Sequence, residues 1–312
     1  YGYFINTQMK NLFFLFSTLF LIHCSSGKDI ISESNLLSEN KNVVKDIIQS
    51  FEIKQTWSQH PDGYQRSVFF KYPENDNNNI PVLILLHGNG GNAKEIINEY
   101  DYIENHLIVS PQGYKKSWNI GRETSKAPDV EFIDEVIERL KTFKNIDTQD
   151  ISIVGYSNGS ALINQLLIEL KTESFKKAIC LFSQLNRLQY RDNSFWSRSN
   201  INLDIHDIKT IPPNFRKILS FTGTSDTTCP YYGGLGIFDY DFIDSEEVAF
   251  IWAKTMGYDG DKIKDPVQIF DNFYKFSYLN DRVIHYKLEG ARHGLDPRFE
   301  RVRDLVKNFI EN

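Results

Sequence analysis

The sequence lacks the patterns by which metal and cofactor sites are most often found. It has no zinc-type spacing of Cys and His, no phosphate-binding Gly-x-x-x-x-Gly-Lys loop and no dinucleotide-binding glycine fingerprint. Asp239 and Asp241 lie close together, but the segment lacks the glycine and glutamate that complete a calcium-binding loop. We therefore expect neither a metal nor a cofactor.

The chain also lacks an excess of positive charge. Its formal net charge is −6, so nothing in the composition predicts a nucleic-acid partner. Contents of 41% hydrophobic and 24% charged residues are typical of a soluble globular protein. A chain of 312 residues without internal repeats can form one large α/β domain with a single core.

The first 55 residues are expected to lie outside that domain. Residues 1–24 have the layout of an export signal, since the apolar run Leu12–Ile22 is too short to span a bilayer. The run is followed by Cys24 in a sequence similar to a bacterial lipobox, in which the cysteine carries the lipid. An ordinary signal peptide cleaved nearby is the alternative. Residues 25–55 are polar and suit a tether, which leaves 56–312 as the folded domain. The protein is thus expected to be exported, and either secreted or anchored to the cell envelope through Cys24 as its only membrane contact.

Beyond the tether, short apolar runs alternate with helical patterns. Strands are expected at 66–72, 80–86, 106–110, 151–154, 177–182, 216–221 and 283–288, and helices at 93–104, 129–140, 159–170 and 298–309. Strands that alternate with helices predict an α/β fold, a doubly wound and mainly parallel sheet with helices on both faces. Ligands of such sheets bind at the carboxyl ends of the strands.

The most informative segment joins one of these strands to a helix. Gly155, Ser157 and Gly159 form a Gly-x-Ser-x-Gly motif across a strand, a sharp turn and a helix. Glycine is favoured at both ends because strand and helix pass so close that a side chain would collide. Such a turn holds the serine in a strained conformation at the sheet edge and points helix N–H groups at the substrate. The motif predicts that Ser157 is a nucleophile.

Two further residues follow strand ends and complete a serine triad. A serine hydroxyl needs a base beside it and an acid that orients the base. Asp226 comes just after the strand at 216–221, and His293 just after the strand at 283–288. The chain order nucleophile, acid, base is that of enzymes with this kind of turn. His87 and His285 are expected to be structural, in a glycine-rich loop and in the core.

A serine hydrolase also needs two backbone donors for the oxyanion. The N–H of Asn158, directly after the nucleophile, is one candidate. The second should come from the segment His87–Gly91, whose glycines let the backbone approach a ligand.

From about Tyr64 onward the chain resembles the secreted esterases of the polyhydroxybutyrate depolymerase and feruloyl esterase group, within the α/β-hydrolase superfamily. The matching segments are 87–91, 111–113, 118–119, 129–133, 145–147, 155–159, 223–226, 230–234 and 289–293. The resemblance implies an α/β-hydrolase fold, the triad above, and Asn89 and Asn158 as oxyanion donors. It also suggests that Trp118, Tyr231 and Tyr232 face the substrate.

Two departures from this group concern the substrate. The group often has cysteine at the position of Asn89, and often a tryptophan soon after the histidine, where this chain reads Gly294-Leu-Asp-Pro297. An insertion at 184–214 carries aromatic residues, among them Trp196, which form either a lid or substrate platform or a cover over the sheet edge.

We therefore predict a serine carboxylic-ester hydrolase that acts on a small-molecule or polysaccharide-linked ester. Feruloyl esters of plant polysaccharides rank first, acetyl esters second and polyesters of the polyhydroxyalkanoate type third. A serine peptidase of the same fold and a tethered binding protein without turnover are the alternatives. Cys180 and Cys229 lie near the ends of neighbouring strands, where they form either a disulfide or two buried thiols.

Overall fold

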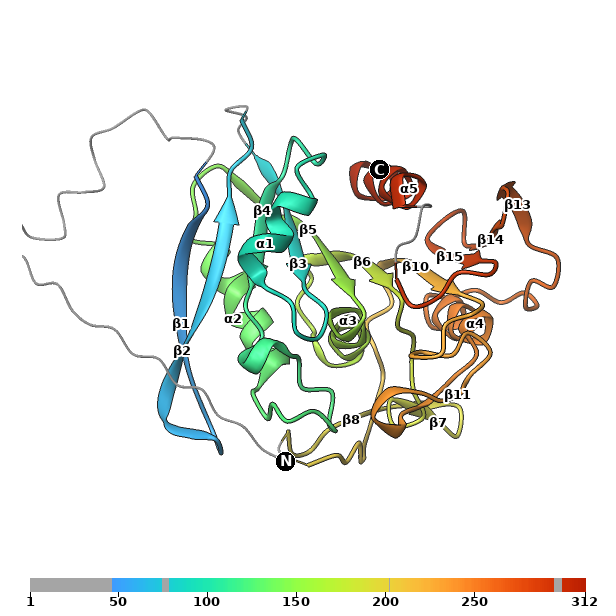
Figure 1. The fold of residues 1–312 in the computed structure, drawn as a ribbon, viewed down its shortest axis with the longest axis horizontal. Coiled ribbons are helices and arrows are strands. Elements are labelled where there is room, and N and C mark those ends of the chain that lie inside the picture. Colours follow the sequence, from blue (N-terminus) through green and yellow to red (C-terminus); the bar gives the residue numbers. More distant parts are fainter. Residues whose placement is uncertain (1–46, 75–78, 202, 295–298) are drawn as a thin grey trace, which may run out of the picture. The chain divides into compact units, whose positions relative to one another are not determined.

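A ten-stranded sheet organises the part of the chain that the structure describes. This structure is a computed structural model that describes residues 47–74, 79–201, 203–294 and 299–312, so the expected signal segment and Cys24 lie outside the described residues. In spatial order (Figure 1) the strands are β1 (Gln49–Trp57), β2 (His60–Lys71), β4 (Leu107–Pro111), β3 (Ile80–Leu86), β5 (Ile146–Tyr156), β6 (Phe175–Leu181), β10 (Lys217–Gly223), β15 (Val283–Leu288), β14 (Phe273–Tyr278) and β13 (Val267–Phe270). Neighbours from β4 to β15 pair in parallel, and the strands at both edges are antiparallel.

Helices cover both faces of this sheet. On one face lie α2 (Asp129–Leu140), α3 (Asn158–Glu169) and α4 (Ser245–Thr255), and on the other lie α1 (Ala93–Glu99) and α5 (Phe299–Glu311). Strand β3 supplies both apolar clusters, because its side chains alternate between the faces. Ile84 packs in the cluster that contains α2 and α3, and Leu85 in the cluster that contains α1 and α5. The predicted mainly parallel α/β sheet with helices on both faces is confirmed.

The folded domain begins earlier than the sequence predicts, with strand β1. Residues 49–55 were expected in the tether, but they form most of β1, which pairs with β2 from Gln49 opposite Phe70 to Trp57 opposite His60. Every second side chain of β1 turns inward, and the ring of Phe51 packs 5.9 Å from that of Phe70. The polar residues between these positions obscure the strand pattern, which explains why the sequence of this segment resembles a polar linker.

The insertion at 184–214 extends the core instead of covering the sheet edge. It forms a small sheet of β7 (Tyr190–Arg191), β8 (Ser194–Ser197) and β9 (Ile208–Thr210). Phe195 is buried and stacks on Trp252 of α4, with ring centroids 4.7 Å apart. Phe195 therefore belongs to the same apolar cluster as the side chains of α3 and α4.

Short elements complete the described chain. They are the 3-10 helices η2 (Tyr114–Lys116) and η3 (Ile237–Asp239) and the two-stranded ladder of β11 (Gly234–Leu235) and β12 (Asp241–Phe242). No helix within the described ranges is long and apolar enough to cross a membrane.

Candidate active site

The turn between β5 and α3 holds Ser157 in a strained backbone conformation. Its φ is +51° and its ψ is −113°, a region that non-glycine residues rarely adopt. A Cβ on Gly155 would lie 2.4 Å from the carbonyl oxygen of Gly159, and a Cβ on Gly159 would lie 2.2 Å from that of Leu86. Both contacts are far too close, so this approach of strand and helix requires the two glycines of the motif.

Three side chains from three strand ends meet at this turn. The Oγ of Ser157 lies 2.8 Å from Nε2 of His293, and Nδ1 of His293 lies 2.8 Å from Oδ2 of Asp226. With the proton on Nδ1, the imidazole donates to the carboxylate and presents the Nε2 lone pair to the serine hydroxyl. The arrangement allows His293 to take the proton of Ser157.

The acid and the base are held together by their loops. Strands β10 and β15 are parallel neighbours, and beyond their ends the N–H of Ser225 donates to the carbonyl of Ala291 at 2.8 Å. The carboxylate of Asp226 is fully buried and accepts hydrogen bonds from the backbone N–H groups of Thr228 and Cys229. These two bonds fix its Oδ1 and leave Oδ2 for the imidazole.

His87 orders the glycine-rich loop that follows β3. The N–H of Gly113 donates to Nε2 of His87 at 3.0 Å, which places the proton on Nδ1, and Nδ1 donates to the carbonyl of Gly88. Burial lowers the pKa of His87 below its ordinary value. A Cβ on Gly88 would lie only 3.6 Å from the Cβ of Ser157, so the loop passes directly beside the serine.

The two residues predicted to supply the oxyanion donors, Asn89 and Asn158, line the same cavity as Ser157. Asn158 is the first residue of α3, and N–H groups in the first turn of a helix have no acceptor within the helix. Its side chain anchors a second loop, because Oδ1 accepts from the N–H of Trp118 at 2.6 Å and Nδ2 donates to the carbonyl of Trp118 at 3.1 Å. Asn89 lines the same cavity as Ser157 and Asn158, on the opposite loop.

This cavity beside Ser157 is small, about 40 Å³. Its walls include Asn89, Glu123, Ser157, Asn158, Phe238 and Tyr240. Glu123 is only 4% exposed, and burial raises the pKa of its carboxyl group above the ordinary value. No sequence motif marks Glu123, and glutamate is usually exposed, so its burial could not be predicted from the sequence.

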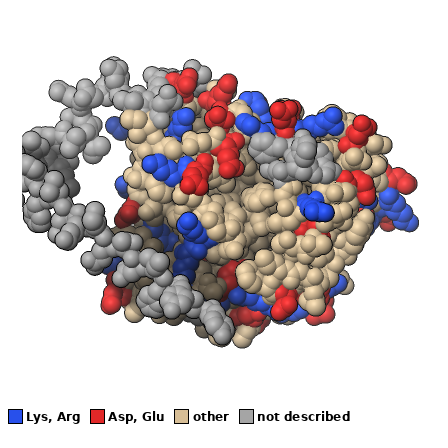
Figure 2. Space-filling model, viewed as in Figure 1, with Lys and Arg blue, Asp and Glu red and all other residues tan. Residues whose placement is uncertain are grey.

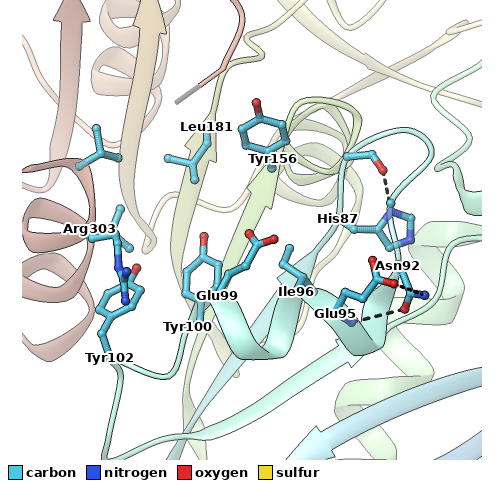
Figure 3. A pocket seen from close by; sticks show the side chains of 14 residues that line it. His87, Asn92, Glu95, Ile96, Glu99, Tyr100, Tyr102, Tyr156, Leu181 and Arg303 are labelled. Carbon is cyan, nitrogen blue, oxygen red and sulfur yellow. Dashed lines mark hydrogen bonds between the residues drawn. The ribbon is translucent and has the colours of Figure 1, made fainter. Parts of the chain in front are cut away.

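A larger cavity of about 360 Å³ lies on the other side of the turn, between α1 and α5. Figure 3 shows Glu99 and Tyr100 on one side of it and Tyr156 and Leu181, from the ends of β5 and β6, on another. Tyr156 directly precedes Ser157, which lines the small cavity but not this larger one. Figure 2 shows acidic and basic side chains scattered around a largely uncharged central area of the viewed face.

Two aromatic residues predicted to face the substrate are buried instead. Trp118 has no exposed surface, and its indole N–H donates to the carbonyl of His87 at 2.8 Å, so it supports the glycine-rich loop from below. Tyr231 is 1% exposed, and its hydroxyl donates to Glu246 of α4. Both predictions are wrong. The sequence indicates that these residues lie in surface loops, but the two rings pack underneath those loops.

The other two aromatic candidates line neither of the two cavities. Tyr232 is 63% exposed and packs edge-on against Tyr231. Trp196 is half-buried on β8, and the guanidinium of Arg191 lies 4.2 Å from the centre of its ring. A role for them in substrate binding stays a prediction.

The remaining titratable residues of interest are structural. Cys180 and Cys229 are buried free thiols, which decides between the two alternatives for this pair, and burial raises the pKa of both to about 12. His285 is buried beside Ser220 and Tyr231, and its pKa falls to about 3. Within the described residues, no cluster of three or more His, Cys, Asp or Glu side chains could hold a metal ion.

Comparison with known proteins gives no matching family model but many similar structures. An acetyl xylan esterase from Aspergillus awamori is 13% identical, with a TM-score of 0.55 and coverage of 84% of this chain and 99% of that chain. A butyrate-bound esterase from Thermogutta terrifontis is 14% identical, with a TM-score of 0.52 and coverage of 83% and 93%. A putative dienelactone hydrolase from Klebsiella pneumoniae is 10% identical, with a TM-score of 0.51 and coverage of 86% and 100%. Together with the strand order and the position of the serine turn, these likenesses show that the chain has the α/β-hydrolase fold.

Proposed function

We propose that this protein is a serine carboxylic-ester hydrolase that works through an acyl-enzyme on Ser157. The observation that carries the proposal is the hydrogen-bonded series Ser157, His293, Asp226 at a strained turn, with 2.8 Å at each link. The two esterases among these solved structures agree with this assignment, and their identities of 13% and 14% relate the folds and not the substrates.

The proposed reaction has two stages. Oγ of Ser157 attacks the ester carbonyl while its proton passes to Nε2 of His293, and the N–H groups of Asn158 and Asn89 stabilise the oxyanion. The C–O bond to the alcohol then breaks, and the alcohol leaves with the proton from His293. Water attacks the acyl-enzyme in the same way, with His293 as base, and releases the carboxylic acid and free Ser157.

The size of the cavity beside Ser157 favours short acyl groups. About 40 Å³ accommodates only a few non-hydrogen atoms, fewer than a feruloyl group contains. We therefore place acetyl-sized esters above feruloyl esters, which reverses the order predicted from the sequence. The larger cavity, at about 360 Å³, would receive the alcohol part, such as a sugar of a plant polysaccharide.

Export is part of this proposal. A lipid on Cys24 would hold the enzyme at the cell envelope, where polymer-linked esters are accessible. Mass spectrometry of the protein purified from cell membranes would reveal a diacylglyceryl group on Cys24; a mature chain that lacks Cys24 would contradict the anchor.

The decisive test compares wild type with Ser157→Ala on p-nitrophenyl acetate and methyl ferulate. We expect acetate release by the wild type, little ferulate release, and loss of turnover and of fluorophosphonate labelling in the variant. Ser160→Ala is the matched control and should retain turnover, since the buried hydroxyl of Ser160 donates to the carbonyl of Ser183 and not to a residue of the triad. Undiminished turnover by Ser157→Ala would overturn the mechanism, and cleavage of peptides but not esters would favour the peptidase.

A further inference from the structure

A buried carboxyl group lies in the wall of the small cavity. The backbone N–H groups of Ile120 and Gly121 donate to Oε2 of Glu123 at 2.8 and 3.0 Å. The hydroxyl of Tyr240 donates to the same oxygen at 3.2 Å. These three bonds satisfy Oε2 and fix the orientation of the whole group.

The other carboxyl oxygen is much less engaged. Oε1 of Glu123 receives a hydrogen bond from Nδ2 of Asn158 at 3.5 Å, the outer limit of such a bond. A carboxylate oxygen has room for two donors, and bonds to an ionised acceptor are normally shorter than 3 Å. Oε1 therefore retains acceptor capacity in a cavity that also contains Ser157.

The described partners of this carboxyl group are all uncharged. Arg122, the adjacent cation, turns outward and donates to Asp204 at 2.6 Å and to the carbonyl of Asp239 at 2.7 Å. Burial of an acid without a cation is costly, which agrees with the raised pKa of Glu123. A donor supplied by a bound substrate would offset that cost.

We propose that Glu123 determines specificity, in that Oε1 accepts a hydrogen bond from a donor group on the acyl chain of the substrate. The inference rests on the proposed esterase function, because it requires that the cavity receive the acyl chain of an ester whose carbonyl carbon Ser157 attacks. The preferred acyl groups are short and carry a hydroxyl or an ammonium group within a few atoms of the carbonyl.

The nearness of Glu123 to Asn158 offers a second reading, in which the carboxylate only positions the N–H that stabilises the oxyanion. Such a role would affect every ester equally, since all esters form the same oxyanion. A role in specificity would affect only esters whose acyl chain carries a donor. The two readings therefore differ in a ratio between substrates.

Three acyl groups of nearly equal size separate these readings. Propionyl, glycoloyl and glycyl esters of one alcohol place a methyl, a hydroxyl or an ammonium group at the same position. The measurement is kcat/KM for each ester with wild type and Glu123→Gln, in which an amide NH₂ can replace Oε1. The intrinsic reactivities of the esters cancel when the glycoloyl-to-propionyl and glycyl-to-propionyl ratios are compared between the two proteins.

We expect Glu123→Gln to lower at least one of these ratios by about tenfold or more while propionyl hydrolysis changes little. A fall in the glycyl ratio alone identifies an ammonium group, and a fall in the glycoloyl ratio identifies a hydroxyl group. Glu99→Gln, in the larger cavity, is the matched control and should leave both ratios unchanged. Hydrolysis of the propionyl ester by Glu123→Gln at nearly the wild-type rate shows that this variant is folded.

Equal ratios in wild type and Glu123→Gln would overturn the proposal, whether or not all three rates fall together. That result leaves the esterase assignment intact as long as the wild type hydrolyses the propionyl ester. Absence of hydrolysis of all three esters by the wild type would instead contradict the proposed function itself.

Discussion

Ser157 and His293 are separated by 136 positions in the sequence, yet Oγ of one lies 2.8 Å from Nε2 of the other. Each follows the end of a strand in the parallel part of the sheet, β5 for the serine and β15 for the histidine. Parallel strands bring their carboxyl ends to one edge, and the register of the intervening strands sets the distance between them. The distance between Ser157 and His293 therefore depends on the whole sheet. The contribution of individual side chains can be tested by single substitutions.

Replacement of Asp226 by asparagine should leave the fold intact and remove most activity. The carboxylate fixes the tautomer of His293 through the 2.8 Å bond to Nδ1, and an amide allows the wrong tautomer. We expect kcat to fall by about 10³–10⁴-fold, measured on p-nitrophenyl acetate. Asp241→Asn, an exposed carboxylate on β12, should retain full activity; a comparable loss there, or none in Asp226→Asn, would contradict the role of Asp226.

The buried ion pair between β2 and α2 should show strong coupling. Nη2 of Arg66 lies 2.6 Å from Oδ1 of Asp129, and neither side chain is exposed. Burial lowers the pKa of Arg66, and the charge of Asp129 opposes that shift. Arg66→Met or Asp129→Asn alone should cost about 3–5 kcal/mol, and the double variant less than the sum, because a single change leaves a buried charge unpaired.

Urea unfolding of the four proteins measures this coupling. Asp101→Asn is a suitable control, since its ion pair with Arg303 spans 3.3 Å at an exposed site and should contribute less than about 1 kcal/mol. Strictly additive costs for Arg66 and Asp129 would show that the two charges do not depend on each other.

Acid should destabilise the protein through a buried neutral histidine. His285 has a pKa of about 3 in the folded state, far below the value of about 6.5 in an unfolded chain. Between pH 6.5 and 3 the unfolded state binds the additional proton, so the free energy of unfolding decreases as the pH falls. From pH 6.5 to 5 this one group should remove about 2 kcal/mol.

The variant His285→Gln tests this dependence. It loses the bonds to Ser220 and Tyr231 and should be less stable at pH 7.5, but its stability should fall less steeply between pH 6.5 and 5. Denaturant unfolding at several pH values gives the slope. The same slope in wild type and variant would exclude His285 as a source of the acid sensitivity.

The residues of the triad could be predicted because their signals are local. Ser157 lies in a motif whose glycines are required because a Cβ at either position would clash with the backbone. Asp226 and His293 each follow an apolar strand. Strand β3 and helix α2 were likewise placed at their observed bounds, since an unbroken apolar run and a helical repeat are strong patterns.

The features that the sequence did not reveal depend on contacts between distant segments. Glu123 is buried, and the hydroxyl of Tyr240, 117 positions away, donates to it. Asp244 resembles a surface acid in the sequence, but it caps α4 by accepting from the N–H of Glu247. The aromatic rings of Trp118 and Tyr231 suit a substrate platform and a buried loop support equally well, and only the packing distinguishes these uses.

The strained serine turn and the two strand ends carry the groups that would make and break bonds, whereas part of the wall of the small cavity comes from other segments of the chain. Phe238 belongs to the segment after β10, and Glu123 to the segment between β4 and α2. A change in length or composition of either segment need not alter the register of any central strand. Substrate selectivity can thus change while the triad stays the same, so related chains could act on different esters through the same chemical step.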